Sequence, residues 1–196
     1  LEQKDQQLLV SVILKRLLRA RVRTEKGMVT DESDEMHIPF PVFVVLEEAH
    51  RFTPAHGESR SKSLLKTILS EGRKFGIGVC LVSQRPGKLD SDALSQCLNQ
   101  IIMKVINPTD QDNIARSVES VTKDLLAELP SLTRGQAVVV GPAVTTPVMV
   151  RIRPRLSPHG GTHKDAPGEW VRACTDIRPE PGPPQPPRER GLFDYD

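Results

Sequence analysis

The chain has 196 residues, of which 37% are hydrophobic and 27% are charged, and its formal net charge at pH 7 is +2. This length and composition are those of a globular protein with a hydrophobic core. The net charge is too small to indicate nucleic-acid binding by itself. No apolar stretch approaches the roughly 18 residues that a membrane-spanning helix needs. The apolar stretch near the N-terminus is interrupted by Lys15 and Arg16, which is not the pattern of a signal peptide. We therefore expect no membrane contact.

The cysteines show no paired spacing: they are Cys80, Cys97 and Cys174. Cys80 and Cys97 lie in apolar patterns, where a thiol behaves as a small core residue. This usage is typical of a reducing compartment and predicts neither a disulfide framework nor a zinc site. We therefore expect a cytoplasmic protein.

Apolar periodicity predicts alternating helices and strands over the first three quarters of the chain. The expected helices are 2–23, one through 64–69 that ends near Gly76 and has Ser61 as its N-cap, 92–98, and two short helices within 109–129. The expected strands are a buried strand over 41–46, followed by 77–82, 101–105, 136–140 and 144–152. The strand–helix–strand order predicts parallel pairing with right-handed crossovers. The last two strands are expected to form a hairpin at a sheet edge. The fold class is therefore α/β.

The composition changes at Pro154, and nine of the 17 prolines lie from this residue onward. We expect residues 1–153 to form the folded domain and residues 154–196 a proline-rich extension. Such a segment cannot build a core of its own, so it is either disordered or an arm that packs on another surface. The apolar side chains at its end, from Leu192 to Tyr195, would suit an anchor for such an arm.

Polar side chains follow the first two predicted strands. Glu47 and Glu48 close the first strand and Gln84 closes the second, while Arg73 ends the helix between them. We expect all of them at one edge of the sheet, where α/β proteins bind ligands. Paired carboxylates suit Mg²⁺ and an attacking water, and an amide and a guanidinium suit a γ-phosphate. The alternative is ordinary: a solvated loop, a strand-end amide and a helix C-terminal cation.

The same residues belong to an ordered string of motifs that resembles HerA, the hexameric DNA-translocating ATPase of the FtsK–HerA group. The motifs are Leu46–Phe52, Glu71–Gly76, Val82–Pro86, Asn107–Asp110, Leu132–Ala137 and Val150–Arg155. The similarity covers roughly residues 1–161. The resemblance implies the C-terminal part of a RecA-like P-loop ATPase core, with a mostly parallel sheet, an antiparallel edge hairpin and a C-terminal arm.

The resemblance also implies residue roles, with ATP and Mg²⁺ as cofactors. Glu47 matches the Walker B acid that supports Mg²⁺; because the wider superfamily commonly has Asp there, its contact with the metal is expected to be indirect. Glu48 matches the carboxylate that polarises water. Arg73 matches the arginine finger that reaches the nucleotide of an adjacent subunit, and Gln84 matches the γ-phosphate sensor.

The chain contains no G-x-x-x-x-G-K-[ST] motif, which would hold the triphosphate, and no counterpart of the N-terminal barrel of HerA. We therefore expect it to be the C-terminal part of a longer protein. By itself it should bind ATP weakly and hydrolyse it negligibly.

The resemblance implies an intact protein that drives double-stranded DNA through a hexameric ring, with a NurA-type nuclease as partner, in end resection and double-strand break repair. Arg60 and Lys62, in the loop after the acids, are candidates for phosphate contacts, although a merely solvated loop explains them equally well. One alternative is a non-catalytic module for oligomerisation or partner docking. Another is a secretion or conjugation ATPase of the same superfamily.

Overall fold

The computed structural model describes residues 2–117, 122–158 and 165–177. It divides into two compact units, Leu1–Arg153 and Pro154–Asp196, which are treated separately. None of the helices in the described residues is long and apolar enough to cross a membrane.

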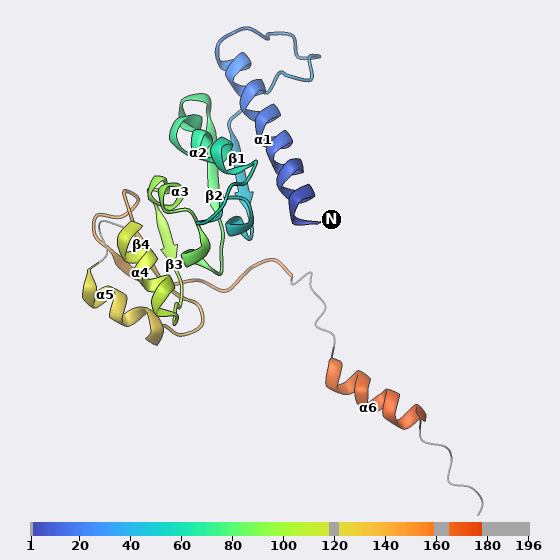
Figure 1. Ribbon diagram of the computed structural model, residues 1–196, viewed down its shortest axis with the longest axis vertical. Coiled ribbons are helices and arrows are strands. Elements are labelled where there is room, and N and C mark those ends of the chain that lie inside the picture. Colours follow the sequence, from blue (N-terminus) through green and yellow to red (C-terminus); the bar gives the residue numbers. More distant parts are fainter. Residues whose placement is uncertain (1, 118–121, 159–164, 178–196) are drawn as a thin grey trace, which may run out of the picture. The chain divides into compact units, whose positions relative to one another are not determined.

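The first unit contains two small sheets and the helices that cover them (Figure 1). Its α-helices are α1 (Gln3–Glu25), α2 (Lys62–Glu71), α3 (Ser91–Gln96), α4 (Pro108–Ser117) and α5 (Lys123–Glu128). Its strands are β1 (Val42–Leu46), β2 (Ile77–Leu81), β3 (Gln100–Ile102), β4 (Gln136–Val140) and β5 (Val148–Arg151). Short 3₁₀ helices are η1 (Ala49–Arg51), η2 (Gly72–Phe75), η3 (Pro86–Lys88) and η4 (Leu129–Ser131). Every one of these α-helices and strands was predicted from the sequence, and the α/β class is confirmed.

The parallel sheet consists of β1 and β2, which run in register from Val42 opposite Ile77 to Leu46 opposite Leu81. Side chains of α1 and α2 form one apolar cluster with one face of this sheet; its fully buried members are Leu14, Leu65, Ile68 and Ile77. On the other face, Phe43 is 69% exposed and Val45 is 56% exposed. The predicted strand is therefore confirmed, but its predicted burial is wrong, because helices of the described chain cover only one of its faces.

The second sheet is antiparallel, in the order β3–β4–β5. The predicted hairpin and its position at a sheet edge are confirmed, although its second strand begins at Val148 rather than at residue 144. The parallel pairing predicted for 101–105 is wrong: Ile101 lies opposite Val139 of β4 in an antiparallel ladder. The reason is packing, because β3 and β4 share an apolar cluster with α4, α5 and η4. That cluster contains Ile102, Ile114, Leu129, Leu132, Val138 and Val140.

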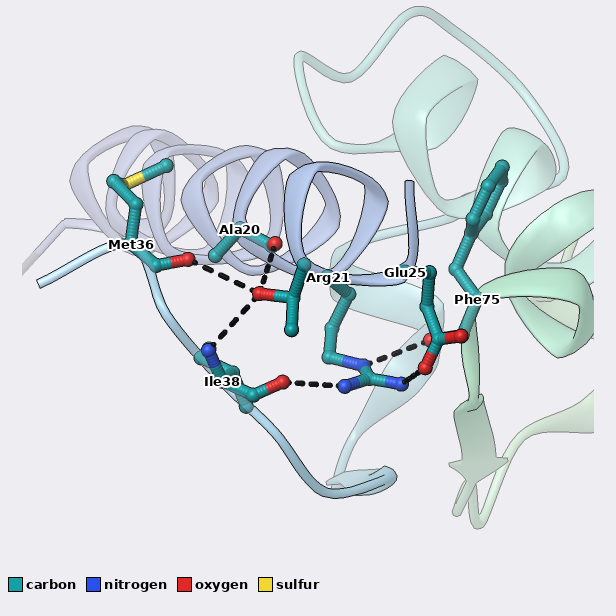
Figure 2. Close-up of polar contacts among 7 residues, drawn as sticks. Ala20, Arg21, Glu25, Met36, Ile38 and Phe75 are labelled. Carbon is teal, nitrogen blue, oxygen red and sulfur yellow. Dashed lines mark hydrogen bonds and ion pairs between the residues drawn. The ribbon is translucent and has the colours of Figure 1, made fainter. Parts of the chain in front are cut away.

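A buried cation, Arg21, which is 1% exposed, joins helix α1 to the segments that precede β1 and β2. Figure 2 shows its guanidinium between the carbonyl oxygens of Ile38 and Phe75 and the carboxylate of Glu25. Its Nε donates to Phe75 O over 2.8 Å. Gly76, which follows, has φ +68°, and a Cβ there would lie 2.7 Å from Arg21 Nη2, so this position requires glycine on both counts.

The second unit contains α6 (Ala166–Ile177), which sequence reasoning missed. The signal was present: Asp165 accepts a hydrogen bond from Gly168 N at the helix start, and the first turn contains Pro167 and Glu169. Trp170 of this helix is 70% exposed. The prolines beyond residue 177 and the apolar terminal residues lie outside the described residues.

Candidate nucleotide-hydrolysis site

Glu48 lies just beyond the end of β1, in an unusual backbone conformation. Its φ of 51° and ψ of 40° are left-handed, and among residues 2–117, 122–158 and 165–177 it is the one non-glycine residue with positive φ. Such a residue costs on the order of 1 kcal/mol or more, and conformations of this kind cluster at functional sites. Backbone hydrogen bonds of 2.9 Å, from Val82 N to Leu46 O and from Ala49 N to Val82 O, fix the chain on both sides of it.

The structure brings Glu48 and Gln84 together, as expected for residues that follow adjacent parallel strands. Gln84 Nε2 donates to Glu48 Oε1 over 3.2 Å. The carboxylate that was predicted to polarise a water and the amide that was predicted to sense a phosphate therefore share one hydrogen bond at the carboxyl end of the sheet.

Two further residues at this edge were missed by sequence reasoning. His50 Nδ1 lies 3.4 Å from Glu48 Oε2 and 3.1 Å from Ser83 Oγ. Ser83 Oγ in turn accepts a hydrogen bond from Arg85 N over 3.1 Å. Their positions were the available signal, because His50 comes two residues after Glu48 and Ser83 directly precedes Gln84.

Glu47 is exposed at the same edge. Within the part of the chain that the structure describes, no group of three or more His, Cys, Asp or Glu side chains is arranged to hold a metal ion. Mg²⁺ in nucleotide sites is commonly held by one or two carboxylates together with phosphate oxygens. Glu47 and Glu48, directly after β1, supply carboxylates of the kind that such a site uses.

Arg73 lies at the opposite end of the sheet from Glu48 and Gln84. It belongs to η2, which precedes the start of β2, whereas Gln84 follows the end of that strand. At about 3.3 Å per residue, the two ends of a five-residue strand are roughly 13 Å apart. The prediction that Arg73 shares one edge with the acids is therefore wrong within a single chain. The reason is that a crossover helix returns the chain to the amino end of the next parallel strand.

The two cations proposed for DNA lie in different environments. Arg60 is exposed, whereas Lys62 is largely buried, with its Nζ 2.8 Å from Asp90 Oδ2. Lys66 Nζ also contacts this carboxylate, 2.9 Å from Oδ1, and lies 2.8 Å from Asp92 Oδ2. The ammonium group of Lys62 is thus used inside the protein, which favours a structural role for that residue.

Asp90 is the centre of these polar contacts and also caps α3 by accepting from Ala93 N over 3.1 Å. Burial by itself would raise the pKa of its carboxyl. The hydrogen bonds from Lys62, Lys66 and Ala93 outweigh burial and lower the pKa of Asp90 from 3.8 to about 2. The carboxylate is therefore ionised at neutral pH and joins α2 to the start of α3.

Comparison with solved structures supports the class of this fold. The DNA-packaging ATPase of Sulfolobus turreted icosahedral virus superposes with a TM-score of 0.52 over 72% of this chain and 62% of that chain, at 14% sequence identity. At this identity the likeness concerns the fold alone. The structure thus shares an α/β fold with this packaging ATPase, and Glu48 and Gln84 lie at the carboxyl end of its parallel strands.

Comparison with curated proteins finds similarity to part of the length of known helicases. A probable helicase of Methanocaldococcus jannaschii is 39% identical over 152 residues, which is 78% of this chain and 29% of that protein. The DNA double-strand break repair helicase HerA of Pyrococcus furiosus is 41% identical over 134 residues, 68% of this chain and 24% of that protein. The chain is thus homologous to a segment of the HerA helicases, as its motifs predicted, and it spans less than a third of the length of these relatives. No protein-family model matches it.

Proposed function

We propose that this chain is the C-terminal part of a HerA-like DNA helicase and translocase that acts in DNA end resection and double-strand break repair. The hydrogen bond between Gln84 and Glu48 at the carboxyl end of the parallel strands carries this proposal. It joins the side chain proposed to orient the water and the one proposed to sense the γ-phosphate, within a sequence 41% identical to a HerA helicase.

In the proposed reaction the residues of this chain position a water and stabilise charge. Glu48 orients the attacking water, and Gln84 donates to the γ-phosphate or to that water. Bound Mg²⁺, supported by Glu47, would neutralise charge on the phosphate oxygens. The chain has no phosphate-binding loop in its sequence, so we expect the isolated chain to hydrolyse ATP negligibly.

Arg73 is proposed to act on the nucleotide of a neighbouring copy. Its guanidinium is exposed and lies at the far end of the sheet from its own Glu48. A ring with head-to-tail interfaces brings such opposite ends of neighbouring copies together. A hexamer, the family's assembly, satisfies this requirement.

Double-stranded DNA and a NurA-type nuclease are the proposed partners. Arg60 is the preferred phosphate contact, because it is exposed while Lys62 is paired with Asp90. Arg60 lines a hollow with Lys4, and Asp5 and Glu58 line the same hollow, so this support comes from the exposure of Arg60 and not from a basic patch.

The first test is ATP hydrolysis by the intact protein carrying Glu48→Gln. Loss of a positioned general base typically costs 10²- to 10⁴-fold, so we expect a fall of at least about 100-fold. Asp92→Asn removes a comparable charge from an exposed site on α3 and should leave hydrolysis unchanged. A Glu48→Gln variant with wild-type activity would refute the catalytic proposal.

The trans role of Arg73 is tested by mixing subunits. Rings that combine Arg73→Ala subunits with Glu48→Gln subunits contain some interfaces with both wild-type groups. These mixtures should regain part of the activity that each pure variant lacks. Inactive mixtures at every ratio, with assembly intact, would exclude the trans role.

An interaction module without catalytic activity is the second candidate, and α6 is the observation that favours it. Trp170 is 70% exposed and Val171 is 67% exposed on this helix. Such apolar side chains suit a docking arm. Under this alternative, removal of residues 154–196 abolishes assembly, while Glu48→Gln changes no activity of the intact protein.

A further inference from the structure

We propose that His50 and Ser83 are positioning residues that hold the carboxylate of Glu48 toward Gln84. This inference rests on the proposed hydrolytic role of Glu48. It assigns a function to two side chains that the sequence motifs leave without one.

The imidazole of His50 is in the right place for this role. Its side chain is 14% exposed, and Nδ1 faces both Glu48 Oε2, at 3.4 Å, and Ser83 Oγ, at 3.1 Å. The backbone of η1 is held as well, because Ala49, the residue before His50, is fully buried against Leu89 and Leu94. The imidazole ring is therefore held in place by the packing of the neighbouring backbone and by the contacts of its own Nδ1.

Hydrogen-bond donors and acceptors determine which form of His50 fits. An ionised carboxylate only accepts, so an attractive contact with Glu48 requires a proton on Nδ1. Ser83 Oγ already accepts from Arg85 N and retains a lone pair for the same Nδ1–H. With its proton on Nδ1, His50 thus donates into the space between Ser83 and Glu48.

The two oxygens of Glu48 are then divided between two partners. Oε1 accepts from Gln84 Nε2 at 3.2 Å, and Oε2 faces His50 Nδ1. One contact alone leaves a carboxylate free to rotate about it, whereas two contacts define its plane. Through Ser83, the second contact depends on the same segment after β2 that carries Gln84. The base and the phosphate sensor are thereby held in one fixed relation.

The test compares three substitutions of His50 in the intact protein. Asn places an amide nitrogen near the position of Nδ1, Gln places one near Nε2, and Ala provides neither. We expect His50→Ala and His50→Gln to lower kcat about 10- to 100-fold with KM for ATP and Tm unchanged, since small misplacements of a catalytic group have effects of this size. His50→Asn should retain most of kcat. His56→Asn, in the exposed loop that follows, is the matched control and should have no effect.

Two results would overturn the proposal. One is an unchanged kcat in His50→Ala. The other is an equal loss of kcat in all three variants together with a lowered Tm, which is the signature of a purely structural role. Ser83→Ala is the second measurement and should lower kcat in the same direction as His50→Ala, again with KM unchanged.

Glu48→Gln, assayed beside these variants, separates the two proposals. If it abolishes hydrolysis while His50→Ala leaves kcat unchanged, the positioning role fails and the proposed function stands. If it leaves hydrolysis intact, both fail together. If the positioning role holds, His50→Ala causes no further loss in a Glu48→Gln background, because the group that His50 positions is already absent.

Discussion

Replacing Asp90 with asparagine tests the polar contacts that join α2 to α3. Asparagine keeps the shape of the side chain and still caps α3, since Asn and Asp are about equally good N-caps. It removes the charge that faces Lys62 and Lys66. The lowering of the pKa of Asp90 from 3.8 to about 2 corresponds to about 2 kcal/mol of stabilisation of the ionised form. We therefore expect Asp90→Asn to lower the free energy of unfolding by about 2 kcal/mol at pH 7.

Urea denaturation followed by circular dichroism measures this loss, and its pH dependence gives a second check. Because the folded-state pKa lies below the ordinary value, the stabilisation is present above pH 3.8 and is lost as the pH falls toward about 2. The difference between wild type and Asp90→Asn should therefore shrink between pH 6 and pH 3. Asp92→Asn is the control: this carboxylate is 70% exposed, and its removal should cost less than about 1 kcal/mol. Equal effects of the two substitutions, or a difference that does not change with pH, would refute the reasoning.

Three further outcomes are expected. Arg21→Ala should destabilise the protein by roughly 3 kcal/mol or more in the same urea assay, because it empties the space of a buried side chain and removes the donor of the Ile38 and Phe75 carbonyl groups. Arg19 is exposed, so Arg19→Ala should be near neutral, and similar losses in both variants would contradict the anchoring role. Cys174 is exposed and should react with iodoacetamide first. Burial, with a smaller contribution from Cys80, raises the pKa of Cys97 to about 11, which should slow the reaction of this thiol. Mass spectrometry that finds the reverse order of modification would refute this prediction. Arg60→Ala in the intact protein should weaken binding to every DNA sequence by a similar factor. It should also reduce the slope of the logarithm of the binding constant against the logarithm of the salt concentration by about 1, and an unchanged slope would exclude Arg60 from the DNA interface.

The sequence predicted the local structure well because its signals are local. The run over 41–46 has the residue types of a strand, and the glycine at the end of η2 has the positive φ that stops a helix. The contact between Glu48 and Gln84 followed from one further rule, that adjacent parallel strands end at the same edge. Residue type, periodicity and strand direction were sufficient for these features.

The pairing of β3 was not predictable in the same way. Its three residues, Gln100–Ile102, are an apolar segment that fits either a parallel or an antiparallel neighbour. Its partner, β4, lies more than thirty residues further along the chain, and the choice is made by the shared cluster with α4 and α5. The prediction that β1 is buried failed for a related reason. An apolar strand of Val, Phe and Leu gives the same sequence pattern whether one of its faces is covered or both are.

The observed position of Arg73 differs from the predicted one, and this difference affects the proposed mechanism most. A guanidinium beside the acids would be able to stabilise a phosphate held by its own chain. The parallel register of β1 and β2 places Arg73 at the amino end of the sheet, while Glu48 and Gln84 occupy the carboxyl end. Arg73 therefore lies at the opposite end of the sheet from a nucleotide held by its own Glu48, which supports the proposal that it serves a second copy. Under that proposal, hydrolysis that needs both groups depends on the interface between copies.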